Sequence, residues 1–233
     1  MRFITSSEFG ESIAARYSCI LPVGAYEQHG PHCVLETDCI TAGYIAEQIG
    51  KLLDVPVLPT IPFGRSVIHR DFPGTIYITD ETYEHYLRDV FSAIRENAIQ
   101  YLFIINGHGG NGPVLDRAIE MEHSDRFKIA LFNWFDYIDD TLFLKESRSH
   151  AGGMETSVIE AIDAHNVRNH LVENGDRVTG FRGRIQNSIK ECTTNGVIGI
   201  ATNHSPAKGI ACINMCCAKI CGEIYRKWGL SNG

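Results

Sequence analysis

Short apolar runs alternate along this chain with segments in which apolar residues recur every three or four positions. The runs are typical of buried parallel strands and lie at 17–24, 101–105 and 127–134. The amphipathic segments predict helices at about 7–16, 38–53, 80–99, 155–164 and 206–228, with a further helix that Pro113 opens. The β-branched alternation of 75–79 predicts one more strand, and the prolines of 55–62 predict extended chain. We expect residues 173–204 to form a long excursion with weak strands.

Strands that alternate with helices predict an α/β fold: three α/β/α layers around a mostly parallel central sheet. The 233 residues suffice for one sizeable core, so we expect a single domain over residues 1–233. In such sheets, ligands bind beyond the carboxyl ends of the strands. Polar stretches at 25–38 and 106–112 begin at two such ends, and we therefore expect them to meet.

Three stretches of the chain carry residue types that bind metals. The candidates are Glu27, His29 and Asp38 in the first stretch, His108 in the second, and His150 with Glu155 in the third. Each has an ordinary interpretation when taken alone, such as a loop residue or, for Asp38, a helix cap. Together, as mixed His, Asp and Glu ligands without a thiolate, they suit Zn²⁺, Mn²⁺ or Fe²⁺. The set exceeds what one catalytic zinc requires and favours a carboxylate-bridged metal pair.

The Gly107–Gly112 turn supports a different hypothesis. Its glycines satisfy the G-x-G-x-x-G pattern after a strand and before a helix, as a dinucleotide fold requires. A nucleotide-cofactor oxidoreductase is therefore the alternative function. Two features weigh against it: the pattern does not follow the first strand, and its first variable position is His108. The glycines have another use, because they let the backbone approach a metal-bound substrate.

Composition and charge narrow the classes of function. A formal net charge of -7 disfavours nucleic-acid binding. The chain contains no run of about 18 apolar residues, which a membrane-spanning helix would require. Its N-terminus resembles no secretion signal. We therefore expect a cytoplasmic protein without a membrane partner. Most of the eight cysteines are interpreted as reduced thiols. Those near the C-terminus, Cys212, Cys216, Cys217 and Cys221, are interpreted as packing residues.

Over nearly its full length the chain resembles the creatininase (creatinine amidohydrolase) family. The motifs that carry the resemblance are Leu21-Pro-Val-Gly…Glu27-Gln-His-Gly-Pro-His32…Thr37-Asp38, Asn106-Gly-His-Gly-Gly-Asn111 and His150-Ala-Gly-x-Met-Glu-Thr-Ser157, with weaker similarity in Phe72-Pro-Gly-Thr75 and Gly199…Ala207-Lys-Gly209. The resemblance implies an α/β/α fold and a site for two divalent ions (Zn, Mn or Fe) per subunit. It also implies hydrolysis of a cyclic amide or formamide C–N bond in a small molecule, by a homo-oligomer that is often a hexamer.

The resemblance also assigns roles to residues. Glu27, Asp38 and His108 would hold one metal ion. His29, Asp38 and Glu155 would hold the other, so that Asp38 bridges the pair. A hydroxide that bridges the metals would attack the carbonyl, and His150 would protonate the leaving nitrogen. Glu155 is thus both a ligand and a part of the catalytic machinery.

One departure from the family pattern concerns the second motif. Creatininases resemble Asn-Gly-His-Tyr-Glu there, with the Glu as a metal ligand, whereas this chain has Gly110 at that place. The pattern is more similar to the formamide-hydrolysing and peptide-trimming branches, so creatinine is not the expected substrate. The residues expected around the substrate are Tyr26, His69, Asp71 and Trp134, with the backbone of Gly109 and Gly110 near the oxyanion. A metal-binding family member without catalytic activity is the remaining alternative.

Overall fold

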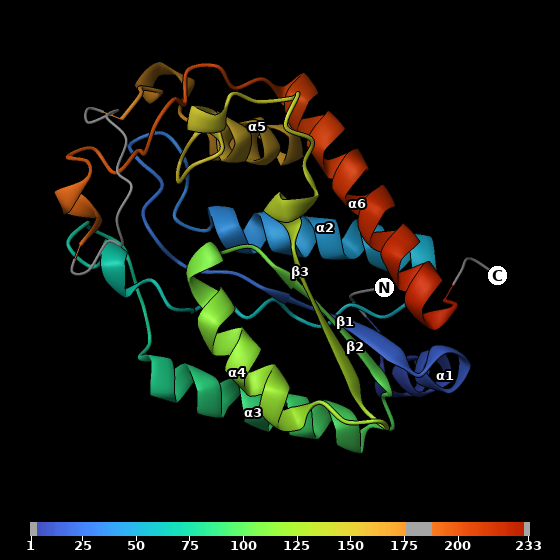
Figure 1. Cartoon of the computed structure of the whole chain (residues 1–233). Coiled ribbons are helices and arrows are strands. Elements are labelled where there is room, and N and C mark those ends of the chain that lie inside the picture. The colour runs from blue at the N-terminus through green and yellow to red at the C-terminus, as the bar shows by residue number, and fades with distance from the viewer. Residues whose placement is uncertain (1–3, 176–187, 231–233) are drawn as a thin grey trace.

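The structure, a computed structural model, describes residues 4–175 and 188–230 (Figure 1). Its sheet contains β1 (Ser18–Val23), β2 (Tyr101–Asn106) and β3 (Lys128–Asn133), all parallel and in the order β1-β2-β3. The proline-rich segment 55–62 runs parallel to β1 through bridges from Val57 to Ile20 and from Ile61 to Val23. The predicted parallel sheet is therefore confirmed.

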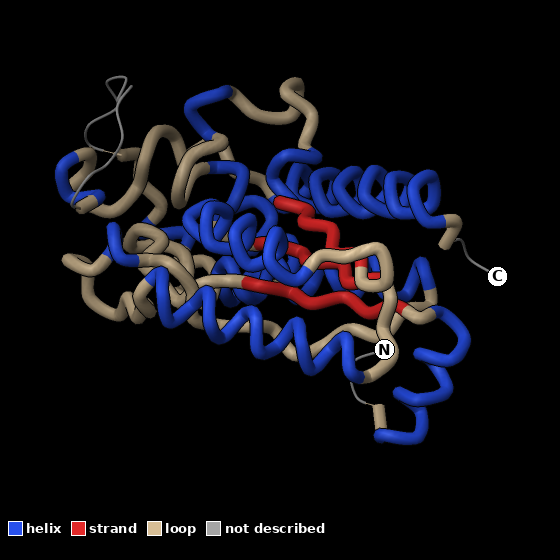
Figure 2. Tube along the Cα trace, turned by 60° about the horizontal axis from the view of Figure 1, so that its bottom comes forward, coloured by secondary structure: helices blue, strands red, loops and turns tan. Residues whose placement is uncertain are grey.

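Helices cover both faces of this sheet (Figures 1 and 2). The helices are α1 (Ser6–Arg16), α2 (Thr37–Leu53), α3 (Asp80–Glu96), α4 (Gly112–Glu122), α5 (Gly153–Ile162) and α6 (Pro206–Trp228). On one face α2 and α6 pack against the sheet and α5 packs against both of them, while α3 and α4 cover the other face. The predicted three-layer α/β/α architecture is confirmed.

Alternate side chains of β2 build the two cores. Phe103 and Ile105 join the core shared with α2 and α6, whereas Leu102 and Ile104 join the core shared with α3 and α4. All four are buried, as expected for a strand covered on both faces. On α6, Cys212, Cys216 and Cys217 lie in the first of these cores, where burial raises their pKa values, and this confirms the interpretation as packing residues.

Two expected strands differ from the structure. Segment 75–79 is not a strand: Ile76 makes only an isolated bridge to Tyr26 and is 50% exposed. The sequence pattern was suitable, but no neighbouring strand provides a ladder of hydrogen bonds. The described parts of 173–204 contain a 3₁₀ turn at Ile189–Glu191 and no strand, and the rest of that segment lies outside the described residues.

The connections contain further 3₁₀ turns. These are Val67–His69, Gly109–Asn111, Trp134–Tyr137, Lys145–Ser147, Ala164–Asn166 and Asn169–Leu171. Three of them, at 67–69, 109–111 and 134–137, contribute residues to the lining of the cavity described below. Among the described residues, no helix has the length and apolarity that crossing a membrane requires.

Candidate metal centre

Gly107 lets the polar stretch 106–112 pack against the stretch 25–38. Gly107 follows β2, and its N–H donates to the carbonyl of Val23 at the end of β1 (2.8 Å). A β-carbon at Gly107 would collide with the carbonyl oxygen of Asp38 and lie 3.0 Å from its carbonyl carbon. Only glycine therefore lets this loop pack on the first turn of α2. The contact explains Gly107 without a nucleotide and places His108 beside Asp38.

Asp38 lies between two imidazoles that come from different loops. Its Oδ1 is 3.1 Å from His29 Nε2, and its Oδ2 is 3.2 Å from His108 Nδ1. The residue is 3% exposed and lies inside the first turn of α2. The N-cap position belongs to Glu36, so the interpretation of Asp38 as a plain helix cap is wrong. Its carboxylate thus presents one oxygen to each imidazole.

Two glutamates complete the cluster. Glu27 is fully buried, and its Oε1 lies 3.2 Å from His108 Nδ1 and 3.5 Å from His150 Nδ1. Glu155 comes from the first turn of α5, where its Oε2 accepts from the backbone N–H of Ala151 (2.7 Å) and lies 3.8 Å from His29 Nε2. The structure thus brings all the predicted ligand side chains to one place.

Backbone carbonyls fix the tautomers of the two ligand histidines. His29 Nδ1 lies 3.1 Å from the carbonyl oxygen of Glu27, and His108 Nε2 lies 3.2 Å from that of Arg65. Carbonyls only accept, so these nitrogens carry the protons and donate. In the neutral form of each ring, His29 Nε2 and His108 Nδ1 carry the lone pairs and face the carboxylates. Metal-bound histidines are oriented in this way.

The donor atoms fit divalent cations. Buried atoms without a hydrogen-bond partner include both carboxylate oxygens of Glu27, Nε2 of His29 and Oδ2 of Asp38. Lone pairs buried in this way are costly unless a cation satisfies them. Ligand atoms of these three residues all lie within 4.8 Å of one another. A second such group joins His29 and His150 to Glu155.

The electrostatics of the cluster also favour positive charge. Burial alone lowers the pKa of His29, but the carboxylates of Asp38, Glu155 and Glu27 outweigh burial and raise that pKa to about 10. Burial raises the pKa of Glu155 to about 7. The cluster therefore attracts protons when no metal is bound, and a metal would displace them.

Gln28, which the sequence pattern does not single out, contacts Nε2 of His150, the ring nitrogen that points away from the cluster. The N–H of Gly30 donates to Gln28 Oε1 (2.9 Å), which turns the amide nitrogen to donate to His69 Nδ1 (3.0 Å). His150 Nε2 lies 2.9 Å from the same amide nitrogen and 2.8 Å from the carbonyl oxygen of Gln28, and in the tautomer that carries its proton on Nε2 it donates to this carbonyl. Nδ1 of His150 is then unprotonated and faces the cluster. Burial, reinforced by the neighbouring histidines, holds the pKa of His150 well below its usual value.

A cavity of about 410 Å³ opens onto this cluster. Its lining comprises His69, Gly107, His108, Gly109, Gly110, Phe135, Asp136, Arg148, Ser149, His150, Met154 and Glu155. A β-carbon at Gly110 would collide with His108 Nε2 and lie 2.8 Å from the carbonyl oxygen of Arg65. Glycine there leaves the ring of His108 undisturbed, and the larger family residue would not fit this loop.

The residues expected around the substrate divide into two groups. His69, Gly109 and Gly110 line the cavity, and His69 Nε2 also lies 3.4 Å from Glu27 Oε1. The other three lie elsewhere. Tyr26 lines a separate cavity beside His32, and Asp71 is exposed.

Trp134 is 1% exposed and packs in the core with α2 and α6. Its successor Phe135 lines the cavity instead. The physical reason is direction, because consecutive residues of the 3₁₀ turn after β3 point to different sides.

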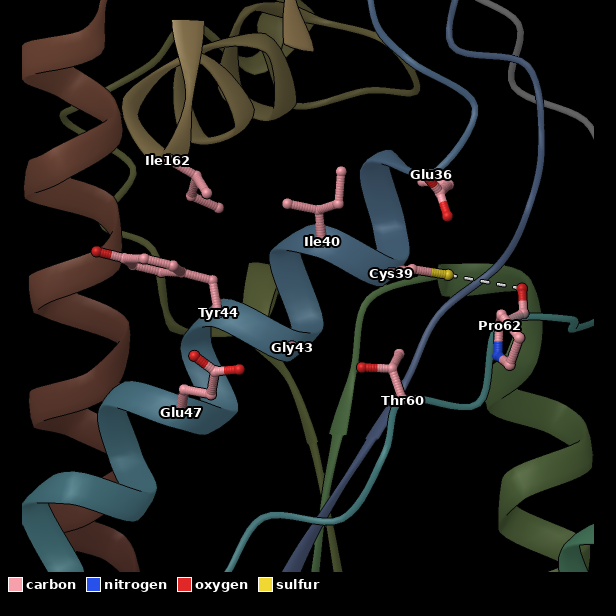
Figure 3. Close-up of a pocket in the computed structure, with 9 residues that line it drawn as sticks. All are labelled: Glu36, Cys39, Ile40, Gly43, Tyr44, Glu47, Thr60, Pro62 and Ile162. Carbon is pink, nitrogen blue, oxygen red and sulfur yellow. Dashed lines mark hydrogen bonds between the residues drawn. The ribbon is translucent and has the colours of Figure 1, made fainter. Parts of the chain in front are cut away.

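A further cavity of about 390 Å³ lies against α2 (Figure 3). Cys39 directs its thiol toward the carbonyl of Pro62, and the aromatic ring of Tyr44 lies farther along the helix. The residues that line this cavity include none of the predicted metal ligands. The chemistry therefore belongs to the cavity that opens onto the ligand cluster.

Comparison with known proteins identifies several relatives. The chain is 32% identical over 154 residues to the "Mycofactocin precursor peptide peptidase" of Mycolicibacterium smegmatis, a match that covers 64% of this chain and 59% of that protein. It is 24% identical over 182 residues to the "Creatinine amidohydrolase" of Pseudomonas putida, covering 68% and 70%. It is 29% identical over 147 residues to the "3-dehydro-scyllo-inosose hydrolase" of Thermotoga maritima, covering 61% and 46%. The chain thus matches about three fifths of the length of the first of these relatives.

Solved creatininase structures share the fold. A creatininase of the Zn-Zn type superimposes with a TM-score of 0.87 at 21% identity, over 97% of this chain and 96% of that one. A creatininase with Mn gives a TM-score of 0.88 at 21% identity, over 97% and 96%. The profile of the Creatininase family, described as creatinine amidohydrolase, matches residues 2–224, and the chain belongs to this family.

Proposed function

We propose that this protein is a metal-dependent amidohydrolase that cleaves the C–N bond of a formamide or a cyclic amide. The observation that carries the proposal is the position of Asp38, whose two oxygens lie 3.1 Å from His29 Nε2 and 3.2 Å from His108 Nδ1. A carboxylate that presents one oxygen to each of two ligand sets is what a two-metal hydrolase needs. Relatives described as an amidohydrolase, a peptidase and a hydrolase support the same class of reaction.

The proposed ligand sets follow the observed contacts. Glu27 and His108, which approach to 3.2 Å, hold one divalent ion together with Asp38. His29 and Glu155, at 3.8 Å, hold the other with the second oxygen of Asp38. Oxygen and imidazole ligands suit Zn²⁺, Mn²⁺ or Fe²⁺. When bound, the ions would supply Lewis acidity, which polarises an amide carbonyl and lowers the pKa of water.

The chain itself moves the proton. His150 presents an unprotonated Nδ1 to the cluster and keeps its other nitrogen bonded to the carbonyl of Gln28. It accepts a proton from the attacking water and returns it to the leaving nitrogen, as a general base and then a general acid. Backbone N–H groups at Gly109 and Gly110 border the same cavity and stabilise the oxyanion.

A second candidate is hydrolysis of a peptide bond. It is favoured by the 32% identity to a precursor peptide peptidase. The nucleotide-cofactor alternative is disfavoured, because Gly107, the first glycine of the pattern, has a packing reason and the chain belongs to a family described as creatinine amidohydrolase. A homo-oligomer, such as a hexamer, stays a prediction that light scattering tests.

The test is a substrate panel for the full chain loaded with Zn²⁺ or Mn²⁺. The panel contains N-formyl amino acids, cyclic amides including creatinine, and short peptides, with release of formate or amine as the readout. His108→Ala should lose bound metal and activity together, whereas His150→Ala should keep the metal. Turnover of peptides alone would select the second candidate. A fully loaded protein that hydrolyses nothing in the panel would favour a non-catalytic family member and contradict the proposal.

A further inference from the structure

The cavity over the ligand cluster is lined by charged side chains of both signs. Among the described residues that line it, Arg148 is the single Lys or Arg. Asp136 lines the cavity as well, where the side-chain amide of Asn133 donates to it (2.9 Å). An anionic group that enters is therefore repelled by Asp136 and attracted by Arg148.

The loop that carries Arg148 is fixed relative to the proposed proton-transfer residue. The N–H of Ile200 donates to the carbonyl of Glu146, and the N–H of Ile198 donates to that of His150, both at 2.9 Å. The N–H of Arg148 itself donates to the carbonyl of Lys145 (3.2 Å). Arg148 thus lies on a short segment, 146–150, whose two ends are hydrogen-bonded to the neighbouring segment 198–200. Because the backbone at Arg148 is already ordered, substrate binding loses no conformational entropy in fixing it.

The present partner of Arg148 is exchangeable. Its Nη1 pairs with Asp140 Oδ1, and the side chain of Asp140 is 90% exposed whereas that of Arg148 is 25% exposed. An ion pair with so exposed a carboxylate adds little stability, because water screens it. A guanidinium also has five N–H donors in a planar fork that matches a carboxylate. A second carboxylate can therefore bind beside Asp140 or in its place.

We propose that Arg148 binds a free carboxylate of the substrate and that the enzyme acts on amides that carry one, such as N-formyl amino acids. This inference rests on the proposed amide hydrolysis for its substrate class. Phe135, which would lie 3.8 Å from a β-carbon at Gly109, borders the same space and packs against the apolar part of such a molecule. Arg148 then determines specificity and takes no part in bond cleavage.

The test compares an acid with its neutral amide. N-formyl-L-alanine and N-formyl-L-alaninamide are titrated into the Zn²⁺-loaded full chain, and saturation-transfer NMR gives a dissociation constant for each. The ratio of the two constants measures recognition of the carboxylate, and it is unaffected by a loss of folded protein that weakens both equally. Formate released in the same tube reports turnover separately. The proteins are the wild type, Arg148→Gln, Arg148→Lys and the matched control Asp140→Asn.

The wild type should prefer the acid by about 10- to 100-fold, as a charge-assisted pair allows. Arg148→Gln should bring the preference close to one, Arg148→Lys should keep part of it, and Asp140→Asn should keep all of it. A preference that survives in Arg148→Gln would overturn the inference and would assign the carboxylate to the metal ions. Absence of formate with an intact, Arg148-dependent preference would instead count against the proposed hydrolysis and leave the carboxylate site standing.

Discussion

Replacing Gly107 by alanine tests the contact that joins the two ligand loops. The new β-carbon would meet the carbonyl oxygen of Asp38 and lie 3.0 Å from its carbonyl carbon and 3.1 Å from the β-carbon of Ala42. These are mostly helix backbone atoms that no rotamer change can move. Overpacking of this kind costs about 1–3 kcal/mol. It also displaces Asp38, so we expect metal affinity to fall by about 10- to 100-fold, as for other groups that orient ligands.

Gly112→Ala is the matched control in the same glycine-rich turn. A β-carbon there meets no atom within 4 Å, and the residue has helical dihedrals at the start of α4. Alanine should therefore leave stability unchanged or raise it by up to about 1 kcal/mol. The two variants should differ by roughly 1–4 kcal/mol in denaturant unfolding of the metal-loaded protein. Equal stability and equal zinc content in both variants would refute the packing argument.

Three further predictions concern single side chains. His150→Ala should keep its metal and lose about 10²- to 10⁴-fold in kcat, and normal turnover would show that another group moves the proton. Gln28→Met should also keep its metal but lose about tenfold in kcat with little change in KM, because the amide hydrogen bond that holds His69 against the ring of His150 disappears. An unchanged kcat would remove Gln28 from the account. Burial raises the pKa of Cys221 to about 11, so at pH 8 about one thiol in a thousand is ionised. Its reaction with a disulfide reagent should be slow in the native protein and accelerate up to pH 10, and a rate equal to that of the unfolded chain at pH 8 would contradict its burial.

Local sequence patterns predict much of the fold. The sequence predicts strand β2 at 101–105, because a continuous apolar run of this length is typical of a strand buried on both faces. In the structure the strand ends one residue later, at Asn106. Helix α6 has the predicted ends, since Pro206 occupies its first turn and Gly229 adopts the left-handed conformation that closes it. The predicted metal ligands also converge, because their stretches follow the carboxyl ends of adjacent parallel strands or lie opposite them.

Other features depend on contacts that no local pattern contains. Segment 75–79 has the composition of a strand, but Ile76 meets only the isolated bridge from Tyr26. Trp134 and Phe135 are consecutive aromatics, and only the direction of the turn after β3 decides which of them lines the cavity. Gln28 resembles an ordinary loop amide until folding brings His150 to it across 122 positions of sequence.

The most direct test of the account counts metal ions per chain in the wild type and in Asp38→Asn. Elemental analysis after dialysis against Zn²⁺ gives the count, and circular dichroism verifies the fold. Glu36→Gln is the control, because Glu36 is exposed at the cap of the same helix and makes no side-chain cap hydrogen bond. If Asp38 bridges the pair, the wild type and the control bind two equivalents and Asp38→Asn loses both. A folded Asp38→Asn protein that still binds two equivalents would contradict the account.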